Sequence, residues 1–176
     1  MGDCEYPWYK EIQNSRNIEQ GDFIPDCPII VPPRDIAQDS TPEVDINLID
    51  SIVLSQSCDL VNDKLEIVLV CPYYPVSEFI KNQKNPGKPE KEKKNLIQGK
   101  YAGFHILEKY PGYLDELQVV DFKNVYGIKI EALRDIAESI EKRIRLLPPY
   151  REHLSQAFAR YFMRVGLPQD IILEDD

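Results

Sequence analysis

The sequence predicts an α+β fold that is mainly β: a small, strongly bent sheet or partly open barrel with an amphipathic helix near the C-terminus. Two apolar runs, residues 51–60 and 65–72, have the length and composition of buried strands. Further short apolar segments are separated by turn residues, and short strands need closure or a covering helix to protect their edges. After residue 148 the apolar residues recur at helical spacing. We expect one domain over residues 1–176, which is long enough for a proper core.

The first half of the chain holds an N-terminal segment and the expected central strands. Residues 1–20 are expected to dock on the domain through a short helix over residues 7–12, and an aromatic surface that stacks a ligand is the alternative. The prolines in residues 27–33 indicate a brief or edge strand, because proline donates no ladder hydrogen bond. The strands expected here span residues 21–33, 44–55 and 65–71. The last of these is apolar at successive positions, so we expect it to be central and covered on both faces.

The second half of the chain mixes short strands with helices. Residues 82–100 contain many lysines and almost no apolar anchors, which predicts a mobile, solvated loop that ends in a short helix. A basic arm that contacts an acidic partner or RNA is the alternative. The expected strands span residues 101–107, 117–122, 125–130 and 142–147, and the expected helices span residues 75–81, 131–138 and 148–166. In the last strand, alternation predicts that Ile144 and Leu146 point inward and that Arg143 and Arg145 point outward.

The charge of the chain is acidic and unevenly distributed. The net charge is −9, and residues 1–80 hold 15 acidic and 4 basic side chains, whereas residues 81–100 hold seven lysines and two glutamates. This overall sign repels phosphate backbones, so it argues against nucleic-acid binding by the whole surface and leaves RNA binding through a local basic face open. No apolar run is long enough to cross a bilayer, and acidic residues stand where a signal peptide has basic ones. We expect a cytoplasmic protein that binds no membrane.

The cysteines and histidines do not have the spacing of a metal site. Cys4, Cys27, Cys58 and Cys71 include no C-x-x-C pair, and the chain has only two histidines. We therefore expect no bound metal and no cofactor. In a reducing compartment the cysteines are expected to be free and mostly buried.

Small polar groups at the end of the first apolar run form the candidate catalytic set. Ser55, Cys58 and Asp59 stand there, and a strand that ends in such groups is a common way to build a site. A thiol needs a base to become a nucleophile, and His105 is the candidate base, with His153 as the other available one. The alternatives are a structural thiol at Cys58 and an Asp59 that caps a turn.

Arginines near the C-terminus form the candidate set for binding an anion or a partner. Arg143 and Arg145 share one face of the expected strand, and Arg160 and Arg164 are four residues apart on one face of the expected helix. These groups would bind a phosphate or the acidic side chains of a partner protein. A solvated face that nearby glutamates neutralise is the alternative.

Three landmarks in the first half resemble the MazF/PemK family of toxin ribonucleases. Gly21-Asp22 begins a strand, residues 52–55 form an apolar strand that ends in Ser, and residues 67–72 form one that ends in Pro. The resemblance covers residues 21–75 in the order of these elements. It implies an SH3-like barrel and, since such barrels are often dimers, a possible homodimer.

The positions that the resemblance assigns to RNA cleavage are replaced in this chain. Alignment on Ser55 places Ile49 and Asp50 where the family has Arg-Pro, and that arginine stabilises charge on the phosphate as the 2′-hydroxyl attacks. Tyr73 and Tyr74 stand where the family has a hydroxyl residue after its proline. We therefore expect a non-catalytic, MazF-like binding or regulatory protein with a protein partner, in a bacterial toxin–antitoxin or phage-defence type system.

Two other functions stay open. One is an endoribonuclease with a relocated active site that uses Arg143 or Arg145 beside Ser55, and the other is a cysteine-dependent hydrolase that uses Cys58. The chain also resembles an uncharacterised bacterial protein family, and this second resemblance implies no function. It rests on residues 55–59, 150–156 and 162–168.

Overall fold

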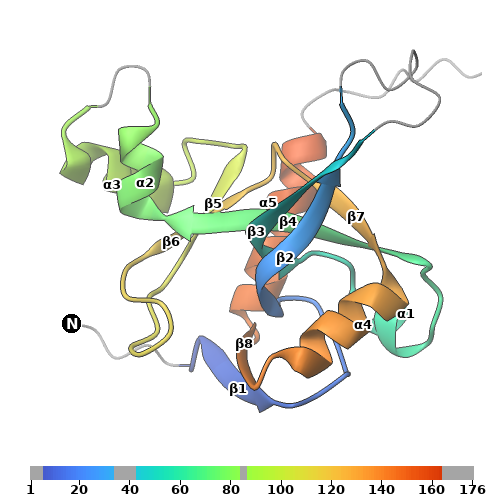
Figure 1. Ribbon diagram of the computed structural model, residues 1–176. Coiled ribbons are helices and arrows are strands. Elements are labelled where there is room, and N and C mark those ends of the chain that lie inside the picture. The colour runs from blue at the N-terminus through green and yellow to red at the C-terminus, as the bar shows by residue number, and fades with distance from the viewer. Residues whose placement is uncertain (1–5, 34–42, 84–86, 164–176) are drawn as a thin grey trace, which may run out of the picture.

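The fold combines antiparallel strands with short helices (Figure 1). The computed structural model describes residues 6–33, 43–83 and 87–163. The strands in this part of the chain are β1 (Tyr9–Gln13), β2 (Phe23–Val31), β3 (Asp45–Val53), β4 (Ile67–Pro75), β5 (Phe104–Leu107), β6 (Gln118–Asp121), β7 (Tyr126–Lys129) and β8 (Lys142–Leu146). The helices are α1 (Ser57–Val61), α2 (Val76–Lys81), α3 (Pro89–Ile97), α4 (Ile130–Ser139) and α5 (Tyr150–Phe162). None of these described helices has the length and apolar character needed to cross a membrane.

β4 is the central strand of the larger sheet. This six-stranded sheet has the order β2-β3-β4-β6-β5, and β7 pairs with β4 as well. Residues 67–70 of β4 pair with β7 and residues 73–75 pair with β6. Val70 belongs to one apolar core, whereas Cys71 and Tyr73 belong to another, because successive side chains point to opposite faces of a strand. The prediction of a central strand is confirmed, whereas cover on both faces holds only from Val70 to Tyr73, because Ile67 and Leu69 are exposed.

A two-stranded sheet of β1 and β8 adjoins the larger sheet at Gly21 and Asp22. The Gly21 amide donates a hydrogen bond to the Val53 carbonyl, and the Gly21 carbonyl accepts one from the Leu146 amide, both at 2.9 Å. Asp22 forms a bridge with Arg145 of β8. The two sheets do not form a closed barrel within the described residues. The α+β class is confirmed at this level.

The helices cover three apolar cores. α5 packs on the first core, which includes Phe23 and Ile144, through residues such as Leu154. α4 packs on the second core through Leu133 and neighbouring side chains. α2 and α3 lie together at one end of β4, where Phe79 joins the third core (Figure 1). β4 contributes Tyr73 to the first core and Val70 to the second, and α2, which follows it, contributes Phe79 to the third.

Several local predictions are confirmed, and others are wrong. Residues 7–12 do not form a helix, because residues 9–13 pair with β8 as a strand. The strand predicted up to residue 55 ends at Val53, and residues 57–61 form a helix instead. The short helix predicted at the end of residues 82–100 is present as Pro89–Ile97, and it takes up much of the segment predicted as a loop, with Leu96 buried in the third core. The remaining predicted strands and short helices occur near their predicted bounds, while residues 84–86 lie outside the described part of the chain.

Candidate functional site

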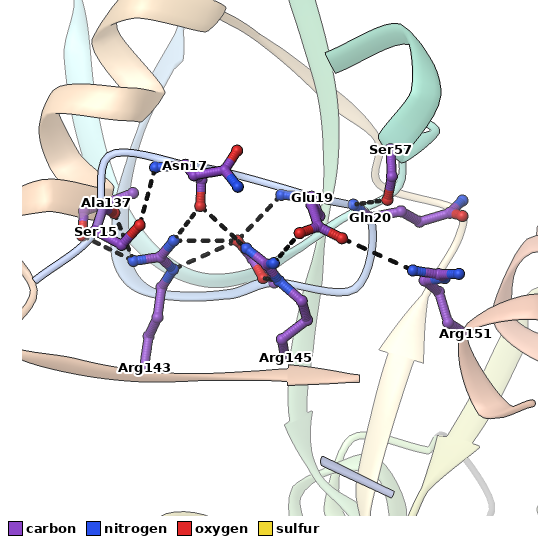
Figure 2. Close-up of polar contacts among 10 residues, drawn as sticks. Ser15, Asn17, Glu19, Gln20, Ser57, Ala137, Arg143, Arg145 and Arg151 are labelled. Carbon is purple, nitrogen blue, oxygen red and sulfur yellow. Dashed lines mark hydrogen bonds and ion pairs between the residues drawn. The ribbon is translucent and has the colours of Figure 1, made fainter. Parts of the chain in front are cut away.

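Arg143 and Arg145 are buried, so the prediction that they point outward is wrong. Their side chains are 0% and 4% exposed. The chain before β2 covers this face of β8, and its backbone carbonyls accept hydrogen bonds from the arginines: Ser15 from Arg143 at 2.8 Å, and Asn17 from Arg145 at 3.0 Å (Figure 2). Ala137 of α4 also accepts one from Arg143, at 3.2 Å. Both faces of β8 are therefore covered, which alternation in a single strand does not reveal.

Asp22 forms ion pairs with both buried guanidinium groups. Its Oδ2 atom lies 3.3 Å from Nη2 of Arg143 and 2.8 Å from Nη2 of Arg145, and its Oδ1 atom accepts a hydrogen bond from Nε of Arg145. Burial lowers the pKa of Arg143, and the Asp22 carboxylate opposes that shift. The two arginines thus hold β8 against the chain before β2. In this arrangement they do not offer the exposed anion-binding face that the sequence predicted, and Arg164 lies outside the described residues.

Glu19 and Gln20 connect this buried ion-pair cluster to the surface. The Glu19 carboxylate accepts a hydrogen bond from Arg145 and lies 3.9 Å from Nη1 of Arg151 on α5 (Figure 2). The backbone amide of Gln20 donates a hydrogen bond to Oγ of Ser57 on α1 at 3.1 Å. These contacts therefore hold residues 19 and 20 in place between α1 and α5.

A groove lies between the α1 segment and α5, and we call it the α1–α5 groove. It consists of two cavities of about 410 and 460 Å³ that share Gln20, Gln56 and Ser155. One end is polar and is lined in addition by Ser57, Cys58, Arg151, Glu152 and Gln156. The other end is mainly apolar and is lined in addition by Leu54, Ser55, Asp59, Leu65, Leu69, Phe158, Ala159, Phe162 and Met163. The groove thus unites two stretches, 55–59 and 150–156, that are almost one hundred residues apart in the sequence.

Ser55, Cys58 and Asp59 all line this groove, but their immediate contacts are structural. The Ser55 hydroxyl accepts a hydrogen bond from the Leu69 amide at 2.9 Å, which ties the α1 segment to β4. Cys58 is a free, exposed cysteine whose thiol donates to Oε1 of Gln56 at 3.8 Å. The Asp59 carboxylate lies 3.9 Å from the Lys64 ammonium group. The groove therefore contains a thiol without a histidine base among its lining residues.

His105 and His153 lie elsewhere. Both line a separate cavity together with Arg160, so the described structure does not bring either histidine to Cys58 in one cavity. The His105 ring stacks on Phe122 with a centroid distance of 6.4 Å. Burial, reinforced by the charges of His153 and Arg160, lowers the pKa of His105 to about 4. His105 is thus a neutral group at neutral pH, and it lines a different cavity from the Cys58 thiol.

The sequence did not single out the α5 side of the groove as part of a site. Arg151 and Ser155 are four residues apart, as are Glu152 and Gln156, so both pairs extend along one side of the helix. This spacing is the sequence pattern that could have indicated a binding face on α5, but the same pattern is also typical of a solvated helix face. The fold was needed to show that this side faces residues 55–59.

A second surface feature is a set of exposed aliphatic side chains on the β2–β3 hairpin. Ile30, Ile46 and Leu48 are 63%, 62% and 65% exposed. Ile30 stands opposite Ile46 and Pro28 stands opposite Leu48, so these side chains share one face of the hairpin. We call this the hairpin face. An exposed apolar patch of this kind is typical of a contact surface.

The described residues include no group of histidines, cysteines and carboxylates that could hold a metal ion. Comparison of the chain with protein-family models, with curated proteins and with solved structures gave no match. The function is therefore argued from the geometry of the groove.

Proposed function

We propose that the protein acts by binding and not by catalysis, and that the α1–α5 groove holds an extended segment of a partner protein. One observation supports this proposal above the others: the groove joins a polar end to an apolar end and lacks a histidine beside its thiol. Sites of this kind combine apolar contact area with a few polar groups that fix orientation.

The polar end provides the groups that an extended peptide needs. Gln56 and Gln156 can each donate and accept hydrogen bonds, and the hydroxyl of Ser155 can do the same. An extended peptide backbone presents amide and carbonyl groups that match this set. Gln20 is fixed before a partner arrives, because its backbone amide donates to Oγ of Ser57 and its side-chain amide donates to the Leu54 carbonyl.

The apolar end provides a place for one aliphatic side chain. Phe162 and Met163 are exposed there and lie beside Leu69 of β4. Burying such side chains against a ligand is favourable at about 25 cal/mol per Å².

The charges in the groove are matched within the protein itself. Nη2 of Arg151 donates to Oε1 of Glu152 at 2.8 Å, and Asp59 lies near Lys64. We therefore expect the bound segment to be uncharged, with an aliphatic residue beside polar residues such as Asn, Gln, Ser or Thr.

A peptide library displayed on phage and selected on the immobilised full chain tests this proposal. We expect the enriched peptides to share an aliphatic residue next to uncharged polar residues. Each enriched peptide is then titrated by isothermal calorimetry against the wild type and against Ser155→Trp, which fills the shared centre of the groove. His153→Trp is the matched control, because it places the same ring on the same helix but outside the groove.

Loss of binding in Ser155→Trp with retention in His153→Trp supports the proposal, provided that both variants keep the wild-type circular dichroism spectrum. Peptides that bind both variants as well as they bind the wild type would place the site elsewhere. A library that yields no enriched sequence would also count against a peptide-binding groove.

A role in a bacterial defence system and a homodimer are two further parts of the proposal. The resemblance to MazF/PemK proteins supports a regulatory or accessory role in a toxin–antitoxin or phage-defence type system. We propose that a second copy of the chain binds the hairpin face, because Ile30, Ile46 and Leu48 leave an apolar surface there. β2 carries prolines at residues 25 and 28, which lack the amide hydrogen needed for strand addition, so contact through the face is favoured over contact through the edge.

The relocated ribonuclease has less support from this geometry. It requires Arg143 or Arg145 beside Ser55, and both arginines are occupied by Asp22 inside the protein. The cysteine-dependent hydrolase likewise lacks a histidine in the groove that contains Cys58.

A further inference from the structure

The two histidines of the chain line the same cavity, which the proposed function does not use. This cavity, here the histidine cavity, has a volume of about 450 Å³. β5 contributes His105, and α5 contributes His153 and Arg160. Its size falls within the range of about 300–1,000 Å³ that is common for small-molecule sites.

The basic residues of the histidine cavity have no acidic residue beside them in its lining. The other lining residues are Leu96, Ile97, Gln98, Gly99, Ala102, Phe104, Ile106 and Ala157. Acidic residues outnumber Lys and Arg in this chain by 30 to 21, so a cavity with only basic ionisable groups departs from the composition. Arg160 has no ion pair among the described residues, and its Nε atom donates only to the Gln156 carbonyl at 3.3 Å.

Arg160 therefore gives the cavity a positive charge at neutral pH that no acidic lining residue compensates. The pKa of His105 is lowered to about 4, first by burial and then by the charges of His153 and Arg160. Phe122, which follows β6, stacks on the ring and brings no charge, and the residues of α3 that line the cavity are uncharged. An anion in the cavity would be attracted by Arg160 and would favour the charged form of His105.

We propose that the histidine cavity binds the phosphate group of a small phosphomonoester. A phosphomonoester carries close to two negative charges at neutral pH, so it attracts the Arg160 guanidinium, and favours protonation of a nearby imidazole, more strongly than a singly charged phosphodiester does. Arg160 can donate two parallel hydrogen bonds to phosphate oxygens. The apolar residues Leu96, Phe104 and Ile106 would contact the organic part of the ligand.

Nuclear magnetic resonance of the histidine rings tests this proposal, because two histidines give two Cε1–H signals. The full-length protein is titrated with phenyl phosphate, inorganic phosphate, methyl phenyl phosphate and a short single-stranded RNA. We expect both signals to shift saturably with phenyl phosphate, more weakly with inorganic phosphate, and least with the singly charged diester. Binding is expected to raise the pKa of His105, because the bound anion favours the charged imidazole.

Two variants show whether the shifts come from this cavity. Arg160→Gln removes the guanidinium from an exposed position on α5 and is expected to weaken phenyl phosphate binding about tenfold. Lys109→Gln removes one exposed positive charge outside the cavity and is expected to leave the affinity unchanged. Equal weakening in both variants would show a general charge effect and would overturn the proposal.

The other probes separate the sources of the phosphate group. Inorganic phosphate that binds more tightly than phenyl phosphate would overturn the assignment of an organic phosphomonoester. RNA that binds more tightly than phenyl phosphate would overturn it in favour of a nucleic-acid site. Absence of a saturable shift with every probe would show that the cavity is not an anion site, and that outcome would leave the α1–α5 groove untouched.

Discussion

Asp22 and Arg143 form an ion pair in which both side chains are fully buried, with 3.3 Å between Oδ2 and Nη2. Burial of charge is costly, and here the cost is offset by a second arginine and by backbone carbonyls that accept the remaining hydrogen bonds. Asp22 directly precedes β2, and Arg143 lies on β8, so the pair joins the two sheets. The same cluster positions Gln20 beneath the α1–α5 groove, which links the stability of the fold to the proposed binding site.

Asp22→Asn is expected to destabilise the protein strongly. The variant keeps the size of the side chain but removes the carboxylate that pairs with the buried Arg143 and leaves Arg145 with Glu19 alone, so we expect a loss of about 3–5 kcal/mol in the free energy of unfolding. Urea denaturation followed by circular dichroism measures this loss. Asp135→Asn is the control, because Asp135 is 65% exposed in its ion pair with Arg16 and should contribute at most about 1 kcal/mol. Similar losses in the two variants would contradict a structural role for the buried cluster.

Gly21→Ala is expected to be costly for a reason that the sequence does not show. Gly21 has φ +84°, and a Cβ atom there would lie 2.9 Å from Cβ of Leu146. Strain at a positive φ and the steric clash together predict a loss of about 2–4 kcal/mol. Gly112→Ala provides the comparison, because Gly112 has φ +82° and no atom within 4 Å of the added Cβ. Its loss should be about 1 kcal/mol, and the difference in urea midpoint between the variants isolates the contact with Leu146.

The parts of the fold that follow a single local pattern were predictable from the sequence. β4 is apolar at successive positions and is central, and α4 and α5 show helical spacing. Segments whose structure depends on a distant partner were not predictable. Residues 7–12 contain helix-compatible side chains, yet pairing with β8 makes this segment a strand.

The same limit applies to the candidate site. Ser55, Cys58 and Asp59 were predicted as candidate catalytic residues, and they line a groove, because small polar groups after a buried strand mark a chain that reaches the surface. The opposite wall on α5 was not assigned to a site, and Arg143 and Arg145 were assigned to the surface. The alternation of β8 indicates which side chains share a face, but it does not indicate that the chain before β2 covers that face.

The three described cysteines are expected to differ in reactivity. Cys58 is exposed, whereas burial raises the pKa of Cys27 to about 11 and raises the pKa of Cys71 well above its ordinary value. In a Cys4→Ser background we expect one fast thiol with Ellman's reagent in the folded protein, and thiols at least about 100-fold slower at Cys27 and Cys71. Adding Cys58→Ser should abolish the fast phase.

The rate at Cys58 also bears on the hydrolase alternative. A structural thiol without a nearby base should react no faster than a free cysteine at the same pH. A rate far above that value, with a pH profile that depends on His105 or His153, would contradict the assignment of the groove as a binding site.

His105 is expected to make stability depend on pH in the mildly acidic range. Its pKa is about 4 in the folded protein and about 6.5 in an unfolded chain, so the unfolded state binds more protons between these values. The contribution is therefore fully present above about pH 6.5 and is lost as the pH falls towards 4, up to about 3 kcal/mol. Urea denaturation of wild type and His105→Gln across this range gives the free energy of unfolding as a function of pH. The difference between the two slopes measures the effect of His105, because the carboxylates titrate in the same way in both proteins. His153→Gln should keep most of the wild-type slope because His153 is exposed, and equal slopes for wild type and His105→Gln would show that burial of His105 does not disfavour its charged form.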